Sequence, residues 1–189
     1  MTAATRSNQR DHILDVALRL MSTHGSAAMS MRLLARECGL GVAALYHYFE
    51  SKDALLAAVV DERRYGDRMA EPPDVDLAGS AEQRLRAMFA EMWRGAIEEE
   101  AIWRLLLGEG VRGEPTVLPV GQALLETVER GLSAWIEAVL PEVDDAGAGA
   151  RIMIGQLFGG FVRHIFDPGL PLSDIEAQAA DALVAAMVR

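Results

Sequence analysis

The chain has 189 residues, of which 51% are hydrophobic and 24% are charged, and its formal net charge is −10. This length is sufficient for one compact domain or for two small domains, each with a core. The single cysteine, Cys38, excludes an internal disulfide framework and a metal site built from several thiolates.

The pattern of apolar residues predicts a helical protein. The polar start, MTAATRSNQRDH, is unlike a secretory signal, and the longest apolar run, from Ile152 to Phe166, is interrupted by Gln156, Arg163 and His164. Alternating strand patterns and Asn-Gly hairpin turns are absent. We therefore expect an all-α fold of about nine helices, a cytoplasmic location and no membrane partner.

The first predicted helix runs from Ser7 or Asn8 to about His24, and Gly25 ends it. Its apolar face recurs at helical spacing and consists of Ile13, Leu14, Ala17, Leu20 and Met21. We expect this helix to brace the two helices that follow it.

Residues 30–49, SMRLLARECGLGVAALYHYF, predict two short helices joined by a tight turn. Ser30 is suited to cap the first of them, and its buried stripe is Met31, Leu34, Ala35 and Cys38. Gly39 suits the left-handed end of that helix, and Gly41 can begin the second, which runs to about Tyr48. Leu45 and Phe49 lie four residues apart and face the core. The second helix then exposes small residues at its start and aromatic residues at its end, which suits insertion into a groove: Val42, Ala43, Ala44, His47 and Tyr48.

Residues 10 to 60 resemble the N-terminal domain of the TetR family of bacterial transcriptional regulators. The similarity comprises the first helix, Gly25, and then S-M-R-L-L-A, C-G-L, A-L-Y-H-Y-F and S-K-D-A-L-L in that order. It implies an N-terminal three-helix DNA-binding domain with a helix-turn-helix, and a C-terminal helical domain for ligand binding and dimerisation. The chain departs from the family at Gly41 and Ala44, where Ser or Thr is common, and at Tyr48, where His is common.

The places of the residues in the predicted helices and the resemblance to the family together predict ten DNA contacts. Lys52 is the only lysine in the sequence, and it directly follows Ser51, the predicted cap of a fourth helix. Helix N-termini readily bind phosphate, so we expect Lys52 to contact a DNA phosphate. The alternative is that Lys52 is an ordinary exposed charge. His47 reads a base or only a phosphate, and Tyr46 lies near the DNA or packs on the first helix. The candidates are Ser30, Arg32, Gly41, Val42, Ala43, Ala44, Tyr46, His47, Tyr48 and Lys52.

Residues 70–79, AEPPDVDLAG, interrupt the helical pattern and predict a domain boundary. The DNA-binding domain is expected at residues 1–70 and an effector-binding and dimerisation domain at residues 71–189. In the second domain Ser80 and Gln83 predict a capping box for a helix ending near Glu98. Further helices are expected over residues 99–107, from Pro115 or Pro119 to Leu140, and after a flexible connection over residues 141–150. Ser173 with Glu176 is expected to cap the last helix.

The second domain is expected to bind a small apolar or aromatic effector. The candidate pocket residues are Met and aromatic side chains at helical spacing, with polar anchors among them, although such stripes are more often ordinary core. They are Met88, Met92, Trp93, Trp103, Trp135, Gln156, Phe158, Phe161 and His164, with Arg104 as a further anchor.

The last two predicted helices suit an interface with a second copy of the chain. Apolar residues wrap most of the helix over residues 152–166, and Gly155 and Gly159 permit close approach of another helix. The TetR family dimerises through its last two helices, so the resemblance implies the same. The candidate interface residues are Ile154, Gly155, Phe158, Gly159, Val162, Phe166, Ala180, Leu183 and Met187.

Charge is divided unevenly along the chain. Residues 1–68 hold nine Lys plus Arg against eight Asp plus Glu, whereas the remainder holds nine against twenty. The end expected to meet DNA is therefore the part that DNA does not repel. Together with these patterns, the resemblance implies a dimeric repressor of a palindromic double-stranded DNA operator, released by an effector. The alternatives are a regulator without an effector, an activator, or an enzyme on this scaffold. We expect no cofactor, metal site or catalytic residue, because the four histidines lack metal-ligand spacing and no nucleophile motif is present.

Overall fold

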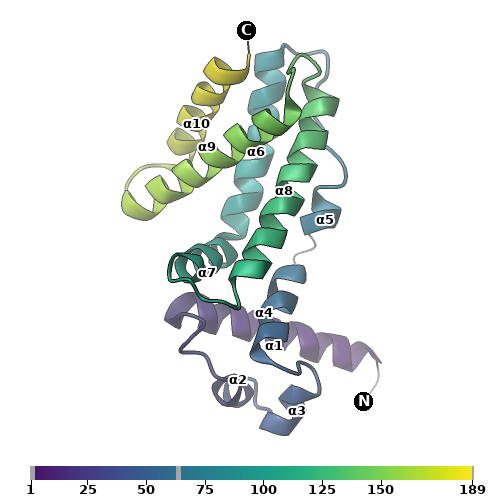
Figure 1. Cartoon of the computed structure of the whole chain (residues 1–189), viewed down its shortest axis with the longest axis vertical. Helices are drawn as coiled ribbons and strands as arrows, with labels where there is room; N and C mark the ends of the chain where they lie inside the picture. Colours follow the sequence, from purple (N-terminus) through teal and green to yellow (C-terminus); the bar gives the residue numbers. More distant parts are fainter. Residues whose placement is uncertain (1–2, 63–64, 189) are drawn as a thin grey trace. The chain divides into compact units, whose positions relative to one another are not determined.

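The computed structural model describes residues 3–62 and 65–188, and these residues form helices and connections without strands (Figure 1). The helices of this part of the chain are α1 (Ala3–His24), α2 (Met31–Glu37), α3 (Val42–Tyr46), α4 (Lys52–Asp61), α5 (Tyr65–Arg68), α6 (Ala81–Glu98), α7 (Glu100–Val111), α8 (Leu118–Val139), α9 (Ala146–Phe166) and α10 (Leu172–Met187). The all-α class is confirmed, with α5 as a four-residue helix. None of the described helices has the length and apolar character that crossing a bilayer requires.

The chain folds into two compact units. The first unit comprises Met1–Arg64 and Glu99–Leu124, and the second comprises Tyr65–Glu98 and Leu125–Arg189. The first unit therefore contains α7 as well as α1 to α4. The functional division at residues 70 and 71 stays a prediction.

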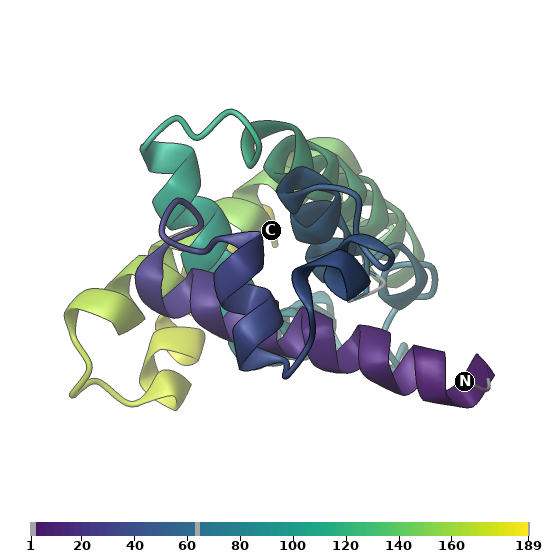
Figure 2. The ribbon, with the colours of Figure 1, turned by 90° about the horizontal axis from the view of Figure 1, so that it is seen from below.

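The first unit is built around α1, which contacts α2, α4 and α7. Figure 2 shows α7 beside the end of α1 from which the chain continues to α2. The side chains at the centre are fully buried: Ile13, Leu34, Leu45, Leu55 and Ile102 are each 0% exposed. Burying one such side chain contributes about 1.5–3 kcal/mol, so this core holds the short helices α2 and α3, which would not be stable alone.

The second unit packs α10 against α6 and α9. Met88 and Phe89 of α6 are fully buried, and the rings of Phe89 and Trp93 stack with centroids 6.5 Å apart. Gly160 of α9 lies so close to this cluster that an added Cβ would be 2.8 Å from the Trp93 ring. The absence of a side chain at Gly160 therefore allows α9 to approach α6.

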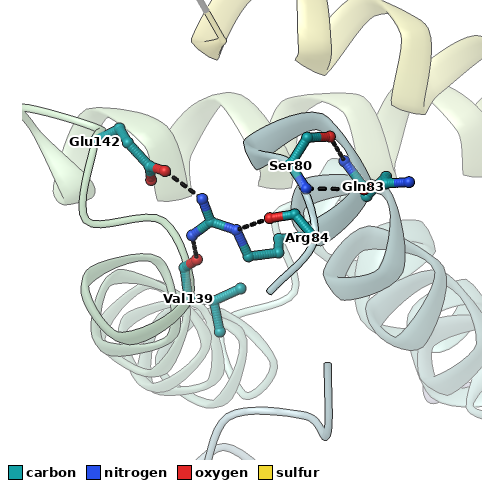
Figure 3. Close-up of polar contacts among 6 residues, drawn as sticks. Ser80, Gln83, Arg84, Val139 and Glu142 are labelled. Carbon is teal, nitrogen blue, oxygen red and sulfur yellow. Dashed lines mark hydrogen bonds and ion pairs between the residues drawn. The ribbon is translucent and has the colours of Figure 1, made fainter. Parts of the chain in front are cut away.

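A buried guanidinium joins the start of α6 to the end of α8 (Figure 3). Arg84 donates to the carbonyl oxygens of Gly79 (3.2 Å) and Val139, and to the Glu142 carboxylate. Beside it, the predicted capping box is present: Ser80 N donates to Gln83 Oε1 at 2.8 Å, and Gln83 N donates to Ser80 Oγ at 3.2 Å. Arg84 satisfies a carbonyl oxygen at the C-terminus of α8 that has no partner within the helix.

The ends of four helices outside the helix-turn-helix differ from the prediction. α1 begins at Ala3 and not at residue 7 or 8, and α7 continues past Gly108 and Gly110 to Val111. The cost of glycine within a helix, about 1 kcal/mol each, is outweighed in α7 by its buried side chains. α9 begins at Ala146, because the Asp145 side chain caps it through Ala148 N at 2.8 Å. The N-cap of α10 is Pro171 without a side-chain bond, so Ser173 and Glu176 are not its capping box.

Candidate nucleic-acid interface

Hydrogen bonds at both ends define α2. At its start, Leu33 N donates to Ser30 Oγ at 3.1 Å. At its end, Gly39 has φ +66°, Gly39 N donates to Arg36 O, and Leu40 N donates to Ala35 O at 2.8 Å. These two bonds form a Schellman motif, which requires the left-handed backbone that glycine adopts without strain. The turn that leads into α3 is therefore set by Gly39.

α3 is held from one side and exposed on the other. Leu45 is 0% exposed and Phe49, just beyond the helix, is 4% exposed. The helix ends at Tyr46, two residues earlier than predicted, and His47 N and Tyr48 N donate to Ala44 O and Leu45 O in a tighter final turn. The opposite side is open to solvent over Gly41, Val42, Ala43, Tyr46 and His47, while Ala44 and Tyr48 are half-buried.

Lys52 is the first residue of α4. Ser51 caps this helix, since its Oγ accepts from Ala54 N at 3.0 Å. Lys52 is half-buried, whereas Ser30 and Arg32 of the α2 start are exposed. The first unit thus holds two capped helix N-termini, at Ser30 and Ser51, and the partial positive charge of a helix start favours phosphate.

Arg10 supports this arrangement, and it was not among the residues predicted from the sequence. Its Nη1 lies 2.5 Å from the Glu62 carboxylate at the end of α4, and its guanidinium lies 5.7 Å from the centre of the Phe49 ring. Arg10 therefore contacts both Phe49, three residues beyond the end of α3, and Glu62 at the end of α4. No local signal could reveal this role, because Glu62 lies 52 residues further along the chain.

Cys38 is the C-cap residue of α2 and is half-buried. Burial raises the pKa of its thiol, and the neighbouring Glu37 carboxylate raises it further. A raised pKa disfavours the reactive thiolate. This agrees with a packing role for the side chain.

The candidate pocket residues are distributed over both units. Trp103 lies on α7 in the first unit, while the others belong to the second. Met88, Met92, Trp93, Trp135 and Phe161 are buried, and Gln156, Phe158 and His164 are half-buried. Trp135 Nε1 donates to Met69 O at 3.1 Å. Trp93 borders an open pocket of about 450 Å³ between α6 and α10, and Gln156 borders another of about 310 Å³ between α9 and α10.

The candidate interface residues divide by exposure. Gly155, Gly159, Val162 and Phe166 are exposed, Ile154, Phe158 and Met187 are half-buried, and Ala180 and Leu183 are buried within the unit. Ile152, which was not among the candidates, is 40% exposed. The exposed α9 residues follow the alternating spacing of three and four that places side chains on one helix face. We call Ile152, Gly155, Gly159, Val162 and Phe166 the α9 stripe.

Comparison with known proteins shows the family. The sequence model of a family described as "Bacterial regulatory proteins, tetR family" matches residues 13–59. A protein of Xanthobacter autotrophicus, described as an "Uncharacterized HTH-type transcriptional regulator in dhlA 5'region", is 33% identical over 155 residues, which cover 71% of this chain and 75% of that protein.

Solved structures agree with the sequence relationship. The crystal structure of a TetR transcription regulator from Haloarcula marismortui superposes with a TM-score of 0.72 at 25% identity, covering 97% of this chain and 100% of that one. A transcriptional regulator from Aquifex aeolicus has the same fold, with a TM-score of 0.74 at 15% identity and coverage of 95% and 99%. These proteins are regulators and not enzymes. The chain belongs to the TetR family and is a DNA-binding transcriptional regulator.

Proposed function

We propose that the protein is a repressor that binds a palindromic operator as a dimer and is released by a small apolar effector. Because it binds chromosomal DNA, we place it in the cytoplasm. In this proposal α3 enters the major groove with its exposed side, and a two-fold dimer brings two such helices to successive grooves. The proposal rests on the family, on the exposed side of α3 and on the α9 stripe.

The DNA contacts that we propose fall into two groups. Ser30, Arg32, Tyr48 and Lys52 position the protein on phosphates, since they lie at or near the starts of α2 and α4. The exposed face of α3 meets the bases, where Val42, Ala43 and Ala44 suit thymine methyl groups and Tyr46 and His47 supply polar atoms. Gly41, the N-cap of α3, lets its backbone approach the DNA.

The observation that carries the dimer is the α9 stripe. Val162 and Phe166 are 49% and 83% exposed, and a Cβ added to Gly155 or Gly159 would meet no atom within 4 Å. A row of exposed apolar residues beside such open glycine positions is typical of a surface on which a second helix packs closely. Ala180 and Leu183 support this surface from within and do not form it.

The effector is proposed to bind the second unit and to stabilise a state that has lower affinity for the operator. Such a response requires the effector to bind the two states with different affinities. α4 starts with Lys52 and leads along the chain toward the second unit, so we propose it as the lever.

A regulator without an effector is the second candidate. The full burial of Met88 and the close approach of Trp93 and Ile175 to Gly160 favour it, because Met88 and Trp93 were expected to line a ligand cavity and are instead packed in the core. A set of apolar compounds that neither raises the melting temperature nor weakens DNA binding would select this alternative.

The proposed function is tested by binding to the DNA that flanks the protein's own gene, with scrambled DNA at matched salt as the control. We expect specific binding that saturates at two chains per palindromic operator and that weakens steeply as the salt concentration increases. Specific binding at one chain per site would exclude the dimer. Equal binding to both DNAs at every salt concentration would exclude an operator in that region.

A further inference from the structure

Glu109 of α7 is a buried carboxylate that does not belong to the proposed DNA contacts. It is 3% exposed, and among the described residues only Ser26 and Arg84 are polar and comparably buried. Glutamate is almost never fully buried unless its charge is paired, because removing a carboxylate from water is costly. We therefore expect hydrogen bonds or an ion pair that offset the free energy of burying this carboxylate.

The partners of Glu109 lie on both sides of the carboxylate. Its Oε1 accepts from the backbone N–H of Ser26 at 2.9 Å and from Arg112 Nη1 at 3.1 Å. Arg112 itself is largely exposed, so the ion pair is partly screened by water. The bond to Ser26 is buried and joins residues 83 positions apart in the sequence.

The Gly25–Ser26 turn is shaped to receive this carboxylate. Gly25 has φ +83°, and a Cβ at this position would lie 3.0 Å from Glu109 Oε1. Glycine is therefore favoured twice, by the left-handed backbone and by the close approach of the carboxylate. The Ser26 side chain contributes nothing visible to the contact, since its buried Oγ has no hydrogen-bond partner.

This turn leads directly to the helix that starts the helix-turn-helix. Gly25 N donates to Met21 O at the end of α1, and Met29 N donates to Ser26 O at 3.2 Å. Ser30, the cap of α2 and a proposed phosphate contact, follows immediately. A displacement of Ser26 would therefore move the start of α2 relative to α1.

We infer that Glu109 is a positioning residue for DNA binding: its carboxylate holds the Gly25–Ser26 turn, and through it the start of α2, so that α7 is a working part of the DNA-binding unit. This inference rests on the DNA-binding function of the first unit. It assigns a DNA-binding role to a residue far from the helix-turn-helix in sequence and without contact to DNA.

The test compares two neutral variants of similar size, Glu109→Gln and Glu109→Met. Both remove the charge and the ion pair with Arg112, but only glutamine retains an oxygen that accepts from Ser26 N. We expect E109Q to bind operator within about twofold of wild type and E109M to bind about tenfold more weakly at equal folded fraction, because a buried N–H without an acceptor favours a rearranged turn. The folded fraction is measured by circular dichroism before each titration.

Two controls separate the hydrogen bond from its surroundings. Ser26→Ala removes only the unpartnered hydroxyl and keeps the backbone N–H. Arg112→Ala removes the part-buried ion pair but keeps the bond from Ser26 N to Glu109. It can lower stability, but at equal folded fraction both variants are expected to bind like wild type. If E109M does not fold, Glu109→Asp takes its place, since its shorter side chain keeps the charge but withdraws the carboxylate from Ser26.

The outcomes are distinct. Weak binding by folded E109M or E109D with rescue in E109Q supports the positioning role. Wild-type binding by folded E109M or E109D overturns it, as does equal loss in E109Q. Wild-type protein that prefers no DNA sequence would instead count against the proposed operator, and melting temperatures and Ser26 amide exchange of the same variants would still report whether Glu109 holds the turn.

Discussion

Lys52 and His47 lie five positions apart, yet their loss should have different consequences. Lys52→Ala removes a cation from a helix start that is proposed to meet phosphate. We expect it to weaken binding to all sequences about equally and to reduce the slope of log affinity against log salt by about 1. His47→Ala removes a side chain from the exposed face of α3 and should change which base pair is preferred. Titrations with a set of single-base operator variants measure both effects.

Arg94→Ala is a matched control for Lys52→Ala, since Arg94 is an exposed cation of α6. Its affinity and salt slope should equal those of wild type. An equal loss across all operator variants for His47→Ala would show that His47 contacts only phosphate. If the slope of log affinity against log salt is unchanged in Lys52→Ala, Lys52 does not contact a phosphate.

The ion pair of Arg84 with Glu142 predicts a pH effect. The hydrogen bond from Arg84 lowers the pKa of Glu142, and a backbone hydrogen bond lowers it further. A carboxylate whose pKa is lower in the folded protein stabilises the fold above its unfolded pKa, and this stabilisation is lost as pH falls through the folded pKa. Glu142→Gln should therefore lower the free energy of unfolding at pH 7 and have no effect near about pH 2. Urea unfolding at both pH values measures the difference, and an equal effect at both would show that charge is not involved.

At the scale of single helices, the capping box of α6 can be tested against a serine that does not cap. Ser80→Ala removes the oxygen that accepts from Gln83 N and should lower the free energy of unfolding by about 1 kcal/mol. Ser173→Ala is the control: Ser173 lies in the first turn of α10, does not cap it, and its Oγ donates to the adjacent Asp174 carboxylate at 3.4 Å. Urea unfolding of the two variants should separate them. Equal stability would mean that the hydrogen bonds at Ser80 do not limit the folding of this helix.

Local sequence was a good guide to helices with a cap of their own. Ser30, Ser51 and Ser80 lie where they were predicted to cap α2, α4 and α6, because a cap depends on atoms within four residues. The prediction for α10 was wrong, since several residues near Pro171 could begin a helix and the packing of Ile175 on its neighbours selects among them. α7 was predicted too short for a similar reason: its buried face outweighs two glycines.

At the scale of the whole molecule, the α9 stripe predicts the state of assembly. Val162→Asp and Phe166→Asp each place a charge on the proposed interface, and the burial of an unpaired charge is costly. We expect both variants to be monomeric and to lose operator binding, measured by analytical ultracentrifugation and DNA titration. Val111→Asp is the control, because Val111 is 90% exposed but lies on α7. If both α9 variants are still dimers, the dimer interface does not include the α9 stripe.

The charge distribution also acts at this scale. The excess of acidic residues after position 68 repels DNA and leaves only the N-terminal end close to neutral. Affinity for DNA in general should therefore be low, and specific binding should depend on two reading helices acting together. This is the physical reason to expect loss of operator binding in monomeric variants.

The sequence by itself determined the family, the all-α class, the short helices around residues 30–49 and the outward face of α3. These features follow from caps, glycines and apolar spacing, which act over a few residues. Only the tertiary structure decided that α7 belongs with the N-terminal helices, that Arg10 reaches Glu62 and Phe49, that Glu109 accepts from Ser26, and that Ala180 and Leu183 are buried. Each of these depends on residues far apart in the chain. The spacing of apolar residues cannot show that a charged side chain such as Glu109 is buried, because its burial depends on a distant partner.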